Sequence, residues 1–217
     1  MRFAQLMRKN ESSGNLVFPD QYRGLQGDDV LPEIVWIQRQ PTLDHCIQVA
    51  CYAEELARLA EFSQREVTLA RAAALLHDIG KVGVSEEILN KAGELSPGEF
   101  TEMRNHSQYG YDFLSQFPDL AEHGQVVLHH HERWDGAGYP AGLAGENIPL
   151  ASRLIHLADA IDVMLRPRSY KWSMPLEWVL GELSHHSGSQ FDPELTSLAM
   201  DWVKTGQLSR CRARIAA

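Results

Sequence analysis

Cysteine is scarce in this sequence, and no run of apolar residues is long. The three cysteines are odd in number and form no CxxC pair; they are Cys46, Cys51 and Cys211. This pattern argues against a disulfide framework and indicates reduced thiols. No segment approaches the ~18 consecutive apolar residues of a membrane span, and the N-terminus lacks the apolar stretch of a signal peptide. We therefore expect a cytoplasmic protein without a membrane segment.

Positive charge is also in deficit. The 217 residues include 20 lysines and arginines against 29 aspartates and glutamates, which gives a formal net charge of −9. Such a balance argues against binding to nucleic acid polymers, although it leaves room for a small anionic ligand in a local basic pocket. The length fits one domain, or one domain with a short appendage.

Period-two alternation of apolar and polar residues is missing, which argues against a sheet-based fold. From about Thr42 onward the apolar residues instead recur at helical spacing. The segment before it has turn signals and no clear periodicity. We therefore predict an all-α fold, with a short N-terminal extension over residues 1–40 and the main domain over residues 41–217.

Several helix boundaries can be read directly. Ser63 and Glu66 form a capping box, and Ser96-Pro97 and Asp192-Pro193 give the same kind of start signal. We expect the Ser63 helix to end at Ile79-Gly80, with the glycine in a left-handed conformation, and the Ser96 helix to continue through His106 to Tyr111. Further helices are predicted over residues 119–131, 150–165, 174–185 and 193–203, with a loop from Gly136 to Ile148.

Histidine, by contrast, is abundant, with ten in the chain, most of them close to aspartates. A carboxylate such as Asp159, among apolar residues on a predicted core helix, is costly unless it is paired or binds a metal. Imidazoles and carboxylates together suit divalent first-row metals. The candidates, five histidines and two aspartates, are too many for one ion but suit two ions bridged by one carboxylate: His45, His77, Asp78, His106, His130, His131 and Asp159. Two ions ~3.5–4 Å apart are a common device for displacement at phosphorus.

Several motifs resemble those of the HD superfamily of phosphohydrolases, and more closely its HD-GYP branch. The matching stretches are residues 73–81, 87–91, 130–140, 148–150, 158–160 and 190–193. The segment His130-His131-Glu132 followed by Asp135-Gly136-Ala137-Gly138-Tyr139-Pro140 is the most specific of them. The resemblance covers roughly residues 42–200. It implies an HD-type bundle of about five core helices with additional C-terminal helices and a Gly/Pro-rich loop.

Carried over by position, the resemblance implies a metal-dependent phosphodiesterase that hydrolyses cyclic di-GMP to pGpG, or further to GMP. One metal would be held by His45, His77, Asp78 and Asp159, and a second by Asp78 as the bridge with His106, His130 and His131. A hydroxide between the ions would be the nucleophile. The family's metals are Fe or Mn, while Ni and Zn also suit these ligands.

The resemblance also assigns substrate contacts. Lys81, three residues past Asp78, would offset charge on the scissile phosphate. Arg168 and Lys171 fall where the family places its other phosphate-contacting cations, and Tyr139 would border the pocket. In the family the Gly/Pro-rich loop that contains Tyr139 is also linked to docking of diguanylate cyclase (GGDEF) domains. A homodimer is compatible with the sequence.

Two departures from the family pattern bear on these expectations. Members with three metals have a glutamate four residues before the first histidine; here that position is Pro41, so a two-metal site is favoured. The stretch Pro167-Arg168-Ser169-Tyr170-Lys171 differs from the family's usual sequence and leaves substrate choice open. Two alternatives therefore stay open: a cyclic dinucleotide sensor or cyclase-docking module with little turnover, and an HD phosphohydrolase for another nucleotide such as cyclic GMP-AMP.

Three further residues near the expected site have simpler assignments. Asp162, one turn past Asp159, is expected to orient a ligand rather than bind metal. His156 is expected to be a hydrogen-bonded core histidine, and Cys46 a buried structural thiol.

Overall fold

The computed structural model describes residues 8–9, 16–17, 40–166 and 174–206, together with residues 208 and 211. Arg168 and Lys171 lie outside the described residues. The described part is helical apart from a two-residue antiparallel strand pair, β1 (Arg8–Lys9) with β2 (Leu16–Val17). The all-α prediction is therefore confirmed. The predicted boundary at residue 40 stays a prediction, because most of the preceding segment is not described.

The helices follow one another with short connections. They are α2 (Gln40–Leu59), α3 (Gln64–Leu76), η3 (Ile79–Gly83), α4 (Glu86–Leu89), α5 (Pro97–Arg104), α6 (His106–Leu114), η4 (Pro118–Leu120), α7 (Ala121–Leu128), η5 (Gly145–Asn147), α8 (Leu150–Leu165), α9 (Leu176–His186) and α10 (Pro193–Lys204), where η denotes a 3-10 helix. None of the helices in these described segments combines the length and apolar character that crossing a bilayer requires.

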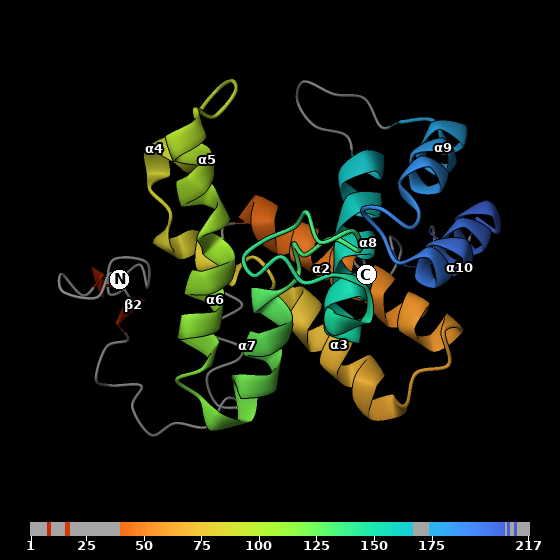
Figure 1. Ribbon diagram of the computed structural model, residues 1–217, viewed down its shortest axis with the longest axis horizontal. Coiled ribbons are helices and arrows are strands. Elements are labelled where there is room, and N and C mark those ends of the chain that lie inside the picture. The colour runs from red at the N-terminus through yellow and green to blue at the C-terminus, as the bar shows by residue number, and fades with distance from the viewer. Residues whose placement is uncertain are drawn as a thin grey trace.

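The helices form two groups around a central set, as Figure 1 shows. Helices α4 to α7 lie on one side, α9 and α10 on the other, and α2, α3 and α8 run between them. The core joins α2, α3 and α8 with α9 and α10 through fully buried side chains such as Leu56, Leu154 and Ile161. Tyr52 of α2 and Trp202 of α10 meet edge to face, with their ring centres 5.3 Å apart. The site is built on the central helices and on the α6–α7 side of the bundle.

The start signals read from the sequence are confirmed. Ser63 and Ser96 each form a capping box with the glutamate three residues later. Asp192 accepts hydrogen bonds from the amides of Glu194 and Leu195 at the start of α10. The loop predicted from Gly136 to Ile148 is also present, interrupted only by η5.

Three helix ends differ from prediction. The Ser63 helix stops at Leu76, and a separate 3-10 turn, η3, follows. The Ser96 helix breaks at Asn105, so that His106 begins α6 instead of lying inside one long helix. The helix predicted over residues 119–131 ends at Leu128, so His130 and His131 lie in the turn after it. In each case the chain leaves the helix where a ligand-type histidine has to turn inward.

Gly80 is required for a different reason from the left-handed helix end that was predicted. Its backbone is not left-handed, and it lies in η3 against the start of α6. A Cβ atom at Gly80 would overlap the backbone carbonyl of His106 and the backbone amide of Gly110. Glycine is required here because two backbone segments approach too closely for any side chain.

Candidate metal centre

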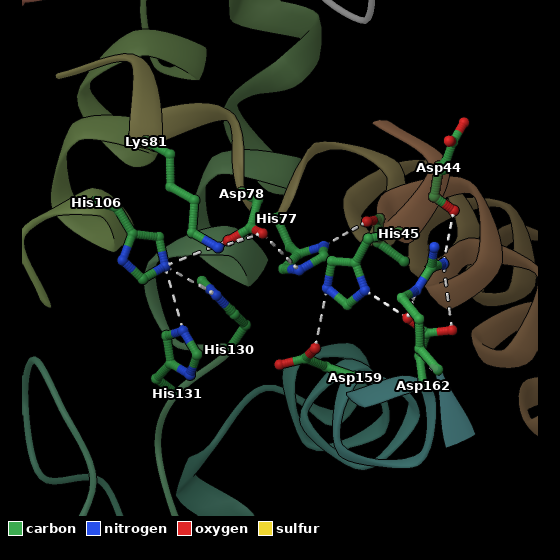
Figure 2. A network of polar contacts seen from close by, with 12 residues as sticks. Asp44, His45, His77, Asp78, Lys81, His106, His130, His131, Asp159 and Asp162 are labelled. Carbon is green, nitrogen blue, oxygen red and sulfur yellow. Dashed lines mark hydrogen bonds and ion pairs between the residues drawn. The ribbon is translucent and has the colours of Figure 1, made fainter. Parts of the chain in front are cut away.

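The structure brings the seven predicted ligand residues into one continuous cluster (Figure 2). One group comprises His45, His77 and Asp78, and the other His106, His130 and His131. Within each group the potential ligand atoms lie within 4.8 Å of one another. Asp159 lies beside the first group, with its Oδ1 3.1 Å from Nε2 of His45. Asp78 stands between the two groups, because its carboxylate oxygens lie 3.6 Å from Nε2 of His77 and 3.7 Å from Nε2 of His106.

Hydrogen bonds to backbone carbonyls orient three of these histidines. Nδ1 of His77 donates to the carbonyl of Ala74, and Nδ1 of His106 to that of Met103, each at 2.7 Å. His130 makes the same bond to the residue three positions earlier, Val127. A carbonyl oxygen can only accept, so the hydrogen of each neutral ring is on Nδ1 and the lone pair is on Nε2.

The Nε2 atoms of the second group point toward one another. Nε2 of His106 lies 3.3 Å from Nε2 of His130 and 3.2 Å from Nε2 of His131. Burial lowers the pKa of all three imidazoles below the ordinary histidine value. Neutral imidazoles with converging lone pairs are what a divalent metal ion requires, so this donor set fits a metal.

His45 is oriented differently, by a carboxylate. Its Nδ1 lies 2.6 Å from Oδ2 of Asp162, while its Nε2 faces Asp159 (Figure 2). Burial by itself disfavours the charged ring, but the hydrogen bonds to Asp159 and Asp162 outweigh it and raise the pKa of His45 to about 9. This contact is of the kind expected if Asp162 orients a ligand, and that role stays a prediction. Arg166, to which the sequence analysis gave no role, in turn pairs with Asp162 at 2.8 Å.

The two aspartates that face the cluster are held as anions. Burial acts to raise the pKa of Asp78, but Lys81 together with the neighbouring histidines outweighs it and keeps the pKa well below its usual range. The Lys81 ammonium lies 2.6 Å from Oδ2 of Asp78. Burial likewise acts against ionisation of Asp159, and the hydrogen bond from His45 lowers its pKa below its usual range. Both carboxylates are thus available as anionic ligands for a metal.

The Gly-rich loop folds back over the turn that carries His131. Glu132 is buried, and its two carboxylate oxygens accept hydrogen bonds from the amides of Ala141 at 2.7 Å and Leu143 at 3.1 Å. A Cβ at Gly138 would overlap backbone atoms of His131 to Arg133. Glu132 had no predicted role, although its position directly after two predicted ligand histidines was the available signal.

Tyr139, the predicted substrate contact, lies against the site. Its ring stacks on that of His131, with centres 4.8 Å apart and planes inclined by 28°. The guanidinium carbon of Arg104 lies over the same ring, 4.4 Å from its centre. Burial raises the pKa of Tyr139 above its ordinary value. Two planar groups therefore already contact the Tyr139 ring, which the sequence did not indicate.

The remaining histidine and cysteine near the site behave as expected. Nδ1 of His156 donates to the carbonyl of His130 at 3.0 Å, and its Nε2 lies 3.1 Å from the amide nitrogen of Gln190. His156 is thus a hydrogen-bonded histidine beside the ligands. Cys46 is fully buried, and burial raises its pKa, so its thiol stays protonated.

Comparison with known proteins agrees with this geometry. A model of the HD domain family matches residues 29–195. A 3'3'-cGAMP-specific phosphodiesterase of Vibrio cholerae is 34% identical over 175 residues, which cover 79% of this chain and 33% of that protein. A cyclic di-GMP phosphodiesterase of Thermotoga maritima is 39% identical over 153 residues, 70% of this chain and 42% of that protein. The chain spans less than half the length of these two relatives.

Solved structures show the same helical arrangement. An HDG"Y"P protein from Bdellovibrio bacteriovorus superposes with a TM-score of 0.60 at 19% identity, over 82% of this chain and 57% of that one. The HD domain of phosphodiesterase PgpH from L. monocytogenes, in complex with cyclic-di-AMP, gives a TM-score of 0.58 at 17% identity, over 82% of this chain and 95% of that one. At such identities these matches show the fold alone.

Proposed function

The chain belongs to the HD domain family, and from that premise we propose that it is a metal-dependent phosphodiesterase that hydrolyses cyclic di-GMP to the linear dinucleotide pGpG. The observation that carries the proposal is the convergence of imidazole nitrogens and anionic carboxylates in two adjacent groups joined by Asp78. Relatives named as phosphodiesterases of cyclic di-GMP and of 3'3'-cGAMP support the substrate class.

We assign the ligands to two divalent ions. His45, His77, Asp78 and Asp159 would hold one, and Asp78 with His106, His130 and His131 the other. Iron or manganese are the first candidates, and nickel or zinc also suit nitrogen and oxygen donors of this kind. Ions bound there would activate a water molecule and polarise the phosphate. Pro41, at the position of the additional glutamate in three-metal members, supports two ions.

Lys81 is the residue that we assign to the reacting phosphate. It lies on η3, with its ammonium beside Asp78 between the two ligand groups (Figure 2). Its side chain is partly exposed, so it can turn toward a bound substrate. Burial acts to lower the pKa of Lys81, but the Asp78 carboxylate raises it, and the ammonium stays charged. A fixed cation here would offset the charge that develops on the phosphate oxygens.

Arg168 and Lys171 remain proposed phosphate contacts. They follow the end of α8, which carries Asp159 and Asp162 near the first ligand group. Tyr139 is proposed to border the substrate beside His131. Docking of diguanylate cyclase domains through the Gly-rich loop, and formation of a homodimer, also stay predictions.

The test is a metal and activity measurement on the same preparations. Protein loaded with Mn²⁺ or Fe²⁺ is expected to convert cyclic di-GMP to pGpG, and Asp78→Ala is expected to lose both metal and activity. Asp201→Ala is the matched control, because this exposed aspartate on α10 has Lys204 as its only ion-pair partner among the described residues. Activity that persisted in Asp78→Ala would contradict a mechanism in which this carboxylate bridges the ions.

A hybrid cyclic GMP-AMP is the second candidate substrate. The observation in its favour is that relatives 34% and 36% identical to this chain are named 3'3'-cGAMP-specific phosphodiesterases. Side-by-side turnover of cyclic di-GMP and 3'3'-cGAMP by the metal-loaded protein decides between them. Tight binding of either ligand, measured by calorimetry, with no product after hours would instead identify a cyclic dinucleotide sensor.

A further inference from the structure

Arg104 has an unusual electrostatic environment for this protein. Within residues 43–166 and 174–206, every other arginine and lysine side chain forms an ion pair with an aspartate or glutamate. Arg104 alone among them has neither an ion pair nor a side-chain hydrogen bond within these described segments. An unpaired guanidinium in a chain of net charge −9 is a candidate for binding an anion from outside.

The position of Arg104 connects it to the metal centre. It is the last residue of α5, two positions before the ligand His106, and its side chain is exposed. Its guanidinium carbon lies 4.4 Å from the centre of the Tyr139 ring and 5.3 Å from that of Phe100. Because Tyr139 stacks on His131, the cation is linked to a predicted ligand by one intervening ring.

Tyr139 is well placed to hold this guanidinium in a fixed orientation. The Gly138 backbone packs directly on residues 131–133, and Glu132 anchors the other side of the loop through the amides of Ala141 and Leu143. A guanidinium whose face lies on an aromatic ring leaves its N–H edge free. That edge is a planar fork of donors that matches two phosphate oxygens.

We propose that Arg104 binds the phosphate of the substrate that is not cleaved. This inference rests on the proposed function, since a cyclic dinucleotide carries two phosphodiesters. When one of them lies at the metal centre beside Lys81 and the proposed contacts Arg168 and Lys171, the other needs a separate cation. Three other described arginines near the site, Arg133, Arg153 and Arg166, are paired with aspartates, whereas Arg104 is not.

The first experiment compares Arg104→Gln and Arg104→Lys with wild-type protein on cyclic di-GMP. Arg104→Gln is expected to raise KM about 10- to 100-fold with little change in kcat, as expected for a lost charge-assisted phosphate contact. Arg104→Lys keeps the charge but loses the planar fork, so its KM should lie between those of wild type and Arg104→Gln. The control Arg71→Gln removes a surface arginine whose ion-pair partner within the described segments is Glu54 on the α2–α3 side, and it should leave KM unchanged.

A substrate with one phosphate separates this role from a structural one. Bis(p-nitrophenyl) phosphate carries only a scissile diester, so its hydrolysis should be the same in Arg104→Gln and wild type. An equal loss on both substrates would mean that Arg104 supports the metal centre and would overturn the proposal. An unchanged KM for cyclic di-GMP would overturn it as well. Wild-type protein that neither cleaves nor binds cyclic dinucleotides would instead refute the proposed function, and the inference with it.

A base contact is the main rival, since arginine also pairs with O6 and N7 of guanine. The KM penalty of Arg104→Gln should be the same for cyclic di-GMP and for its 7-deazaguanine analogue, which lacks the N7 acceptor. A penalty that disappeared with the analogue would assign Arg104 to the base and sink the phosphate assignment.

Coupling to Tyr139 gives an independent check. If Tyr139 acts by holding Arg104, Tyr139→Ala should raise KM less in the Arg104→Gln background than in wild type. Tyr139→Phe keeps the ring that contacts the guanidinium, so the KM penalty of Arg104→Gln should be as large in the Tyr139→Phe background as in wild type. Strictly additive effects of Tyr139→Ala and Arg104→Gln would contradict the idea that the ring positions the cation.

Discussion

At the residue scale, three histidines of the site make the same hydrogen bond to a backbone carbonyl at the end of a helix. His77, His106 and His130 each donate Nδ1–H to the carbonyl of the residue three positions earlier. Those carbonyls belong to the last turns of α3, α5 and α7, where the regular amide partners of a helix run out. The helix end is thus satisfied and the imidazole is fixed in the tautomer that a metal needs.

His45 has a carboxylate partner instead, and this difference leads to a prediction. Asp162→Asn removes the anionic acceptor of His45 Nδ1 while keeping a side chain of similar size. We expect metal affinity to fall about 10- to 100-fold, because partners of this kind fix the ring and increase its basicity. Competition with a chromogenic chelator measures the effect.

The matched control for this change is Asp201→Asn, an exposed substitution on α10. It should leave the metal affinity as in wild type. If Asp162→Asn also retained wild-type affinity, then the contact between His45 and Asp162 would be a feature of packing rather than of metal binding.

At the scale of elements, the close crossing of η3 and the start of α6 places Asp78 and Lys81 beside His106. Gly80 permits the crossing, since a Cβ there would overlap the carbonyl of His106 and the amide of Gly110. Gly110 itself faces Val127 of α7 at a separation that leaves little room for a side chain. Two glycines thus let three elements approach, and the approach brings ligands from all three together.

Gly80→Ala is therefore predicted to be strongly destabilising. Neither backbone can move without displacing its element, so we expect a loss of more than about 3 kcal/mol in the free energy of unfolding, together with weaker metal binding. Urea unfolding followed by circular dichroism measures it.

Gly181→Ala on α9 is the control, because it is expected to stabilise the protein instead of destabilising it. Nothing lies within 4 Å of a Cβ built at this position, so alanine should stabilise the helix by about 0.5–1 kcal/mol. A Gly80→Ala protein as stable as Gly181→Ala would refute the tight crossing.

At the scale of the whole molecule, the predicted ligands come from α2, from the end of α3, from α6, from the turn after α7 and from α8. Metal binding would therefore join the α6–α7 side of the bundle shown in Figure 1 to the central helices α2, α3 and α8. Without an ion, the protein keeps Asp78 and Asp159 charged in a buried setting, which is costly unless they are paired. Bound metal should thus contribute to the stability of the entire fold.

Removal of metal is predicted to lower the melting temperature of the protein. An ion present at a thousandfold excess over its dissociation constant adds about 4 kcal/mol, or roughly 8–16 °C for a chain of this size. Calorimetry before and after EDTA, followed by re-addition of Mn²⁺, measures the shift. The Asp78→Ala variant should respond much less to EDTA, and an equal response in both proteins would show that the chelator acts elsewhere.

Much of this protein could be predicted from its sequence. Apolar periodicity and the capping residues Ser63, Ser96 and Asp192 determine the all-helical fold, because these are local properties of the chain. The seven ligand candidates could be named from residue type and motif, and the structure brings them together. The helix ends were less predictable, since a histidine that turns inward and a histidine that continues a helix look alike in sequence.

Only the tertiary structure decided how these residues work together. His45 and Asp162 are 117 positions apart, and no local pattern states that their side chains lie 2.6 Å from each other. Gly80 is required because two backbones approach closely there. Arg104 has no carboxylate partner among the described residues. Both facts depend on which segments pack nearby, which is a property of the folded chain. The sequence by itself determined the helices and the metal-binding residue types, because short-range backbone preferences and side-chain chemistry fix both. Packing decided which atoms converge, since contacts between distant segments exist only after the helices have assembled.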